Sequence, residues 1–333
     1  MATYYDQNKY NSLRATYHFF RFQRYDYTLE NEQLSVKYYF SLDDKYFFTP
    51  SFGIPKRRFY DFNNLNNSQL DVILFNIGMI ELISYWKLAC PKRVYIQPFK
   101  LNDNQIRWWK KLYFNGLGEF FYLNGIKENV NDFMEIINES EKSCDKINIQ
   151  LNESTLVPVG GGKDSVVTLE LLKNKMPIIP LIINPRGATT ECVSTAGFSE
   201  EQVAVIKRTL DSTMLRMNNE GFLNGHTPFS AMLAFYTLLI GFATNSKYIA
   251  LSNESSANEP TVPDSEINHQ YSKSIAFEND FRYYVNKYIS SDIEYFSFLR
   301  PLNEIQIASL FSRNKDYYKV FKNLFKEGMP ISS

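Results

Sequence analysis

The sequence predicts an α/β protein in which a parallel-sheet domain follows a smaller, aromatic-rich α+β domain. After about residue 150, short and continuously apolar runs of strand type alternate with helical segments, which is typical of a parallel sheet covered on both faces. Before that point, runs rich in Tyr and Phe precede two helical patterns. The expected domains are residues 1–150, with a role in substrate recognition, and residues 151–333, which carry the chemistry.

The first domain is expected to begin with an antiparallel ribbon over residues 15–50, where Leu34, Val36 and Tyr38 alternate with more polar neighbours. The spacing of apolar residues then predicts a helix over 68–89, which should end before the proline at position 91. A short strand over 94–98 should follow.

A second helix is expected to begin near Asn102 or Asp103 and to bury Trp109. We expect the pair Trp108–Trp109 to belong to the core rather than to a base-stacking platform, because no basic patch accompanies it. The polar segment 128–149 marks the domain boundary.

The second domain should open with a βαβ unit, and further strands and helices should follow it. The expected elements are a strand over 155–159, a helix over 166–173, a strand over 177–184, a helix from the capping sequence Ser199–Gln202 through Leu210, a strand over 213–217, a buried helix over 229–244 and a strand over 248–251. The segment 229–244 lacks charge, but its apolar part is shorter than a membrane span, so it predicts a buried helix.

Composition excludes several classes of protein. The chain has 333 residues with 36 Lys+Arg and 36 Asp+Glu, and a net charge of zero argues against nucleic acid as a partner. The three cysteines form no C-x-x-C pair, so neither a disulfide framework nor a cysteine zinc site is expected. The first residues show no secretory pattern, and we expect a cytoplasmic location.

A glycine-rich loop, Gly160-Gly161-Gly162-Lys163-Asp164-Ser165, lies between the first expected strand of the second domain and its helix. Glycines permit positive φ and a close approach of backbone N–H groups to an anion, and the start of the helix adds free donors. The spacing fits neither the Walker A loop nor the dinucleotide fingerprint. A plain tight turn needs fewer glycines, so the sequence favours phosphate binding.

This loop resembles the SGGxDS signature of the PP-loop ATP pyrophosphatases, which split ATP into AMP and pyrophosphate. The resemblance implies ATP as a substrate, Mg²⁺ held in part by Asp164, and contacts to pyrophosphate from Lys163 and Ser165. Gly160 stands where the family usually has serine. This departure argues against the sulfur-inserting and amide-forming members.

Later motifs resemble the ATP-dependent UDP-N-acetylmuramoyl-L-alanyl-L-glutamate epimerases of peptidoglycan synthesis. They are residues 224–228 (NGHTP), 252–259 (SNESSANE) and 266–274 (EINHQYSKS), and the resemblance covers roughly residues 155–285. It implies a UDP-linked muramoyl dipeptide as substrate and an acyl-adenylate on the terminal L-glutamate. Adenylation removes the carboxylate charge, so that a base can take the α-proton and an acid can return one to the opposite face.

The candidate site residues follow from these motifs. The proton carriers would be drawn from His226, His269, Lys273 and Cys192. The nucleotide would contact Gly160, Gly161, Gly162, Lys163, Asp164, Ser165, Asn184, Arg186, Ser252, Asn253 and Glu254, and Mg²⁺ would be held by Asp164, Glu254 and Glu259.

Simpler interpretations of the same residues stay open on the sequence alone. Each histidine is equally well explained as a hydrogen bonder beside a helix, Arg186 as a surface arginine, and the polar segment 252–270 as a disordered loop. Three other functions also stay open: amide formation by another PP-loop enzyme, epimerisation or activation of another carboxylate, and ATP binding without catalysis.

Overall fold

The structure is a computed structural model that describes residues 7–31, 33–258 and 271–320. Its strands are β1 (Phe19–Glu30), β2 (Gln33–Leu42), β3 (Tyr46–Phe48), β4 (Ser51–Ile54), β5 (Arg93–Ile96), β6 (Glu135–Asn138), β7 (Asn152–Pro158), β8 (Ile178–Ile183), β9 (Ala204–Thr209), β10 (Ser246–Leu251) and β11 (Glu294–Ser297). Its helices are α1 (Gln7–Thr16), α2 (Asn67–Trp86), α3 (Asp103–Gly116), α4 (Gly118–Leu123), α5 (Lys163–Leu172), α6 (Gly187–Thr195), α7 (Ser212–Asn219), α8 (Phe229–Ala243), α9 (Ile275–Tyr284) and α10 (Glu304–Ser312).

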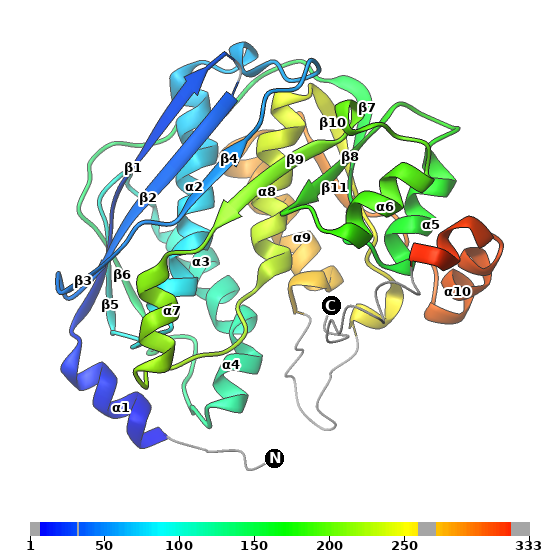
Figure 1. The fold of residues 1–333 in the computed structure, drawn as a ribbon. Coiled ribbons are helices and arrows are strands. Elements are labelled where there is room, and N and C mark those ends of the chain that lie inside the picture. Colours follow the sequence, from blue (N-terminus) through cyan, green and yellow to red (C-terminus); the bar gives the residue numbers. More distant parts are fainter. Residues whose placement is uncertain (1–6, 32, 259–270, 321–333) are drawn as a thin grey trace.

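The strands form one eleven-stranded sheet in the order β11-β10-β7-β8-β9-β4-β2-β1-β5-β6, with β3 paired to β2 (Figure 1). The five strands from β7 to β11 are parallel to their neighbours within this group. Strands β1, β2 and β4 pair antiparallel, and β4 joins the two groups by pairing antiparallel with β9. The predicted mixed α/β architecture with a parallel sheet in the second half is therefore confirmed.

Both faces of the parallel group are covered, as the apolar strand runs predict. Neighbouring residues of β7 and β8 point to opposite sides: Leu156 and Leu181 join the cluster that contains α2 and α8, and Val157 joins the cluster that contains α5 and α6. Both clusters are buried, which explains why these strands lack the polar alternation of a half-exposed sheet.

The expectations for the first half are largely confirmed. The ribbon is formed by β1 and β2, and the expected helices correspond to α2 and α3. Helix α2 ends at Trp86, and α3 begins after Asn102, whose side chain accepts hydrogen bonds from the backbone N–H groups of Asn104 and Gln105. Trp109 is fully buried and Trp108 nearly so, which confirms their assignment to the core.

Two expectations in the second half are wrong. The capping pair of Ser199 and Gln202 forms but opens only a 3-10 turn, and the residues after it form β9 instead of a helix. The expected strand over 213–217 is instead helix α7, which buries Met214 and Met217 one turn apart and is capped by Asp211. The β-branched residues of 203–206 fill the centre of the sheet, and this tertiary packing outweighs the local capping signal.

Helix α8 is the expected buried helix, and its side chains from Phe235 to Ala243 are all buried. Across residues 7–31, 33–258 and 271–320, no helix combines the length and apolar character needed to cross a membrane.

The core continues past residue 150. One apolar cluster contains residues of α2 and α3 from the first half and residues of α8 and α9 from the second. Strand β6, which the sequence did not predict, lies inside the polar segment 128–149 and pairs with β5. The division into two domains stays a prediction.

Candidate functional site

The carboxyl ends of β7, β8, β9, β10 and β11 meet at one edge of the sheet, because these strands are parallel. Numbered 1 to 5 along the chain, they lie in the order 5-4-1-2-3, so the connections after β7 and after β9 leave in opposite directions. In open parallel sheets of this kind, ligands bind outside the carboxyl ends at the point where the direction changes. That point lies between β7 and β10.

The glycine-rich loop follows β7 at this point and leads directly into α5. Gly161 has φ +85°, and a Cβ there would lie 3.4 Å from Thr189, so this glycine is explained by the turn itself. A Cβ added to Gly160 or to Gly162 would meet no atom within 4 Å, and neither residue has a positive φ. Their backbone is exposed at the start of a helix, where it can approach an anion closely.

Three polar side chains follow the glycines. The Lys163 ammonium lies 2.9 Å from Oδ1 of Asp164 and 3.7 Å from Oε1 of Glu304, at the start of α10. Burial works to lower the pKa of Lys163, but the hydrogen bond that its ammonium donates to Asp164 and the charges of the nearby carboxylates outweigh burial, so this pKa is raised. The Ser165 hydroxyl donates to the Gly162 carbonyl over 2.9 Å and holds the loop against the helix.

The segment after β10 lies beside this loop. Oε1 of Glu254 accepts a hydrogen bond from Ser256 over 2.8 Å, while its Oε2 is buried without a hydrogen-bond partner in the described part of the chain. The Ser252 hydroxyl is likewise buried and unpaired among the described residues. The Asn253 amide donates to Ser297 over 3.0 Å. Two unsatisfied polar groups at this edge are typical of a site that a polar ligand completes.

Lys273 belongs to the same group of charges. It is half-buried, and this burial lowers its pKa against the opposing influence of Asp164 and Glu254. Lys163, Asp164, Glu254 and Lys273, from three separate loops, thus influence one another electrostatically. A lysine with a lowered pKa gives up its proton more readily than an ordinary lysine, which suits it to proton transfer.

The residues after β8 are less closely tied to this group. Asn184 adopts φ +50° and its side-chain oxygen accepts from the backbone N–H of Arg208 over 2.7 Å, so it links the ends of β8 and β9. Arg186 precedes α6. Its backbone N–H donates to the Thr189 hydroxyl, which in turn donates to the Arg186 carbonyl, and the Arg186 side chain is exposed. Among the described residues, nothing draws the Arg186 guanidinium into the site.

His226 lies on the connection between α7 and α8, in a segment that accepts hydrogen bonds from the first half of the chain. It is exposed, and its neighbours Asn224 and Gly225 accept hydrogen bonds from Asn124 and from the Lys87 ammonium. His269 and Glu259 lie outside the described residues.

Cys192 lies under the glycine-rich loop rather than in the open site. It is fully buried on α6, and its thiol donates to the Gly161 carbonyl over 3.5 Å. Burial raises its pKa to about 12, with a further contribution from Glu191. These properties fit a thiol that supports the loop by packing.

Arg300, which sequence patterns did not single out, connects several parts of the edge. Its guanidinium donates to the carbonyls of Glu254 and Lys273 over 2.9 and 2.7 Å, and it pairs with Glu278 over 3.1 Å. It therefore holds together the segments that carry Glu254 and Lys273. The run of strand-forming aromatic residues just before Arg300, at 295–298, is the signal that places it after a strand.

Comparison with known proteins finds relatives of this chain. Three similar proteins are each named UDP-N-acetyl-alpha-D-muramoyl-L-alanyl-L-glutamate epimerase. That of Xanthomonas oryzae pv. oryzae is 29% identical over 243 residues, covering 72% of this chain and 53% of the relative. Those of Salinispora tropica and a Micromonospora species are each 29% identical over 249 and 251 residues, covering 74% of this chain and 53% and 54% of the relatives.

The chain thus spans about half the length of the curated relatives it matches. The model of one protein family, described as the MurL N-terminal domain, matches residues 11–298. That match includes the glycine-rich loop, the segment after β10 and all the strands of the sheet. The chain belongs to the family of the MurL N-terminal domain.

Proposed function

We propose that this chain carries the ATP-binding and proton-transfer site of an epimerase that converts the terminal L-glutamate of UDP-N-acetylmuramoyl-L-Ala-L-Glu to D-glutamate. The proposal rests on one observation. Glu254 and Lys273 lie close enough to the glycine-rich loop to interact electrostatically with it, at the point where the connections between the parallel strands leave in opposite directions. The names of the three relatives support the substrate and the reaction. The PP-loop assignment is part of the proposal.

The residues present fit ATP and Mg²⁺. Gly160 and Gly162 leave exposed backbone for the phosphates, and Lys163 offers a charge that the raised pKa preserves. Mg²⁺ prefers one or two carboxylates together with phosphate oxygens, and Asp164 and the unsatisfied oxygen of Glu254 would supply them. Bound Mg²⁺ would neutralise charge on the phosphates.

The proposed reaction begins at the glutamate carboxylate. One of its oxygens bonds to the α-phosphorus of ATP, the bond from that phosphorus to the bridging oxygen breaks, and pyrophosphate leaves toward Lys163. In the resulting acyl-adenylate the carboxylate charge is gone, so one side chain removes the α-proton and another returns a proton to the opposite face. Water then releases AMP and the D-glutamyl product.

The proton carriers are assigned by position. Lys273 lies among the site charges and has a lowered pKa, so it is the first candidate for one face. His226 is exposed, and both His226 and His269 belong to motifs of the family resemblance, so the second face is assigned to one of these histidines. Cys192 is assigned to support of the loop.

The test is turnover in D₂O with ATP, Mg²⁺ and UDP-N-acetylmuramoyl-L-Ala-L-Glu, using a chain that includes any segment the longer relatives require. The product should carry deuterium at the glutamate α-carbon, and AMP and pyrophosphate should form in equal amounts. Two separate proton carriers should leave recovered L-substrate nearly unlabelled, whereas one carrier would label it as well.

Variants separate the steps of the reaction. Lys273→Met should stop deuterium incorporation but keep pyrophosphate release, and Lys175→Met, at an exposed lysine beyond α5, should change neither. Formation of ADP, or of D-product without ATP, would contradict the proposal. Pyrophosphate release with an added amine as acceptor, and without epimerisation, would favour amide formation.

A further inference from the structure

The sheet has a second carboxyl edge, on the side opposite the glycine-rich loop. Strands β1, β5 and β6 are parallel to one another, and they run against β7–β11 because β1, β2, β4 and β9 pair antiparallel in series. The loops after β5 and β6 therefore lie where β7 to β11 begin.

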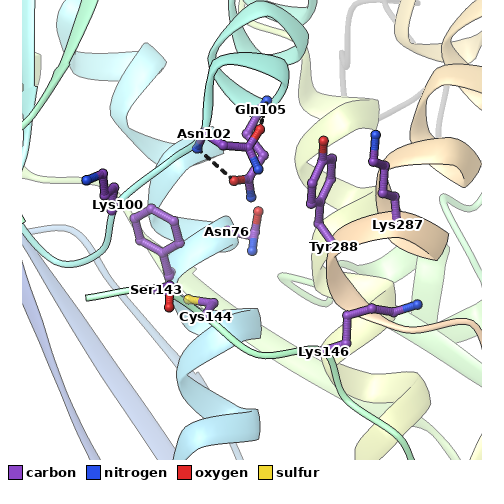
Figure 2. A pocket seen from close by; sticks show the side chains of 10 residues that line it. Asn76, Lys100, Asn102, Gln105, Ser143, Cys144, Lys146, Lys287 and Tyr288 are labelled. Atoms are coloured by element: carbon purple, nitrogen blue, oxygen red, sulfur yellow. Dashed lines mark hydrogen bonds between the residues drawn. The ribbon is translucent and has the colours of Figure 1, made fainter. Parts of the chain in front are cut away.

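A cavity of about 250 Å³ lies between the segments that follow β5 and β6 and the end of α9. Figure 2 shows the side chains that line it. Lys100 and Asn102 come from the loop after β5, Lys146 from the segment after β6, and Lys287 from a π-helical turn (Val285–Ile289) after α9. A shallower hollow continues from it, shares Lys146 and Lys287, and adds Arg282. Among the described residues, no Asp or Glu lines either space.

The lysines are able to receive an anion. The pKa of Lys287 is raised, first by its hydrogen bond with Tyr283, so its ammonium stays charged at neutral pH. Lys100 pairs with Glu141 over 2.6 Å, but Glu141 is 90% exposed, and such a pair is weak and readily displaced.

The neutral wall of the cavity is held in place by hydrogen bonds. Asn76 is 3% exposed; its amide donates to the Val72 carbonyl over 2.7 Å, and its oxygen accepts from Tyr284 over 2.9 Å. Asn102 and Gln105 bond to each other at the start of α3 (Figure 2). A rigid polar wall beside adaptable lysine side chains is suited to a small ligand of fixed shape.

We propose that this cavity is a second ligand site that binds a phosphate-bearing small molecule, separate from the glycine-rich loop. Three lysines line the cavity, and its described lining residues include no carboxylate, which favours an anion and disfavours a metal ion. Their ammonium groups point in different directions (Figure 2), so the flexible lysine side chains turn inward when an anion binds. Phosphate is favoured over an isolated carboxylate because the shared Lys146 and Lys287, together with Arg282, extend the positive charge into the adjoining hollow.

Cys144 lines the cavity and provides a direct probe of occupancy. It is partly exposed, whereas Cys90 and Cys192 are fully buried. The rate of Cys144 alkylation by a maleimide, followed by peptide mass spectrometry, is measured alone, with inorganic pyrophosphate and with UDP, without Mg²⁺. Sodium chloride keeps the ionic strength equal in all samples. We expect pyrophosphate, UDP or both to slow alkylation at least threefold.

Variants identify the source of the protection. Lys146→Ala combined with Lys287→Ala should abolish it, and both side chains are exposed, so the fold should persist by circular dichroism. Lys163→Ala in the glycine-rich loop and Lys175→Ala on the surface should keep it. Protection by UDP but not by pyrophosphate would indicate that the amide side chains of Asn76, Asn102 and Gln105 bind the uracil base. No protection in the wild type, equal protection in the double variant, or loss in Lys163→Ala would overturn the proposal.

Discussion

Lys163 is the residue whose role in the proposed site is most directly testable. Its ammonium lies at the start of α5 next to Asp164, where it would stabilise the charge that develops on departing pyrophosphate. Lys163→Ala should lower ATP-dependent pyrophosphate release by about a hundredfold or more, the usual cost of losing such a group. Release is measured with a coupled phosphate assay. Lys175→Ala serves as the control, and unchanged release from Lys163→Ala would remove the lysine from the mechanism.

Lys87 makes stability depend on pH. Burial lowers the pKa of its ammonium to about 8, while the unfolded chain has the ordinary value of about 10.4. Between these values the unfolded state binds more protons, so the free energy of unfolding rises as pH rises. Relative to Lys87→Met, the wild type should gain about 1.5–2 kcal/mol between pH 7.5 and 9.5.

Urea unfolding of both proteins at several pH values measures this gain. The difference between the two proteins cancels the titration of the many tyrosines that both contain. A flat difference over this range would show that Lys87 keeps an ordinary pKa in the folded state.

At the scale of elements, a buried ion pair connects α2 to β9. Arg208 and Glu81 form a bidentate ion pair, in which Nη2 of Arg208 lies 2.7 Å from Oε2 of Glu81. The two side chains are 10% and 2% exposed, respectively. The Tyr236 hydroxyl of α8 donates to Glu81 over 3.1 Å. Burial tends to lower the pKa of Arg208, but the charge of Glu81 reverses this effect and raises it.

Glu81→Gln should therefore destabilise the protein by about 3–5 kcal/mol, because it leaves the Arg208 charge buried without a counter-charge. The exposed pair of Arg216 and Glu220 gives the matched control, and Glu220→Gln should change stability by less than about 1 kcal/mol. Urea unfolding measures both. Similar losses in the two variants would show that the buried pair has no special role.

The elements that sequence patterns predict well are those in which local and tertiary preferences agree. The Asn66 cap and the apolar run of α2 both favour a helix, and the Gly160–Gly162 loop follows an unmistakable strand. Between Ser199 and Met217 the two preferences conflict: a capping sequence precedes residues that fill the sheet centre. Local sequence patterns do not show which segment will form a central strand of the sheet.

The candidate site likewise contains residues that the sequence predicts and residues that it does not. The loop residues Lys163 and Asp164 were found because glycines and charges occur together in the sequence. Arg300 was missed because its partners, the carbonyls of Glu254 and Lys273, are distant in sequence and bear no side-chain signature. Contacts to backbone carbonyls become visible only in the fold.

At the scale of the whole molecule, the two halves of the chain share one sheet and one large apolar cluster. Strand β9 of the second half pairs with β4 of the first through Phe52 and Arg208, and one apolar cluster includes α2, α3, α8 and α9. The Trp108 and Trp109 indoles donate to the Asp280 carbonyl and the Tyr284 hydroxyl over 2.9 and 3.0 Å. The largest apolar cluster therefore draws on both halves of the chain, while a smaller one around α5 and α6 belongs to the second half alone.

The expected consequence is a single cooperative unfolding transition for the chain, with neither 1–150 nor 151–333 folding alone. Cys90 in the first half and Cys192 in the second are both fully buried, so pulses of a thiol reagent at increasing urea report each half separately. The two cysteines should become reactive at the same urea concentration, and tryptophan fluorescence should change there too, since the tryptophans all lie in the first half of the sequence. Midpoints separated by more than the width of the transition would show two independently stable domains, because a core shared across β4 and β9 cannot lose one half and keep the other.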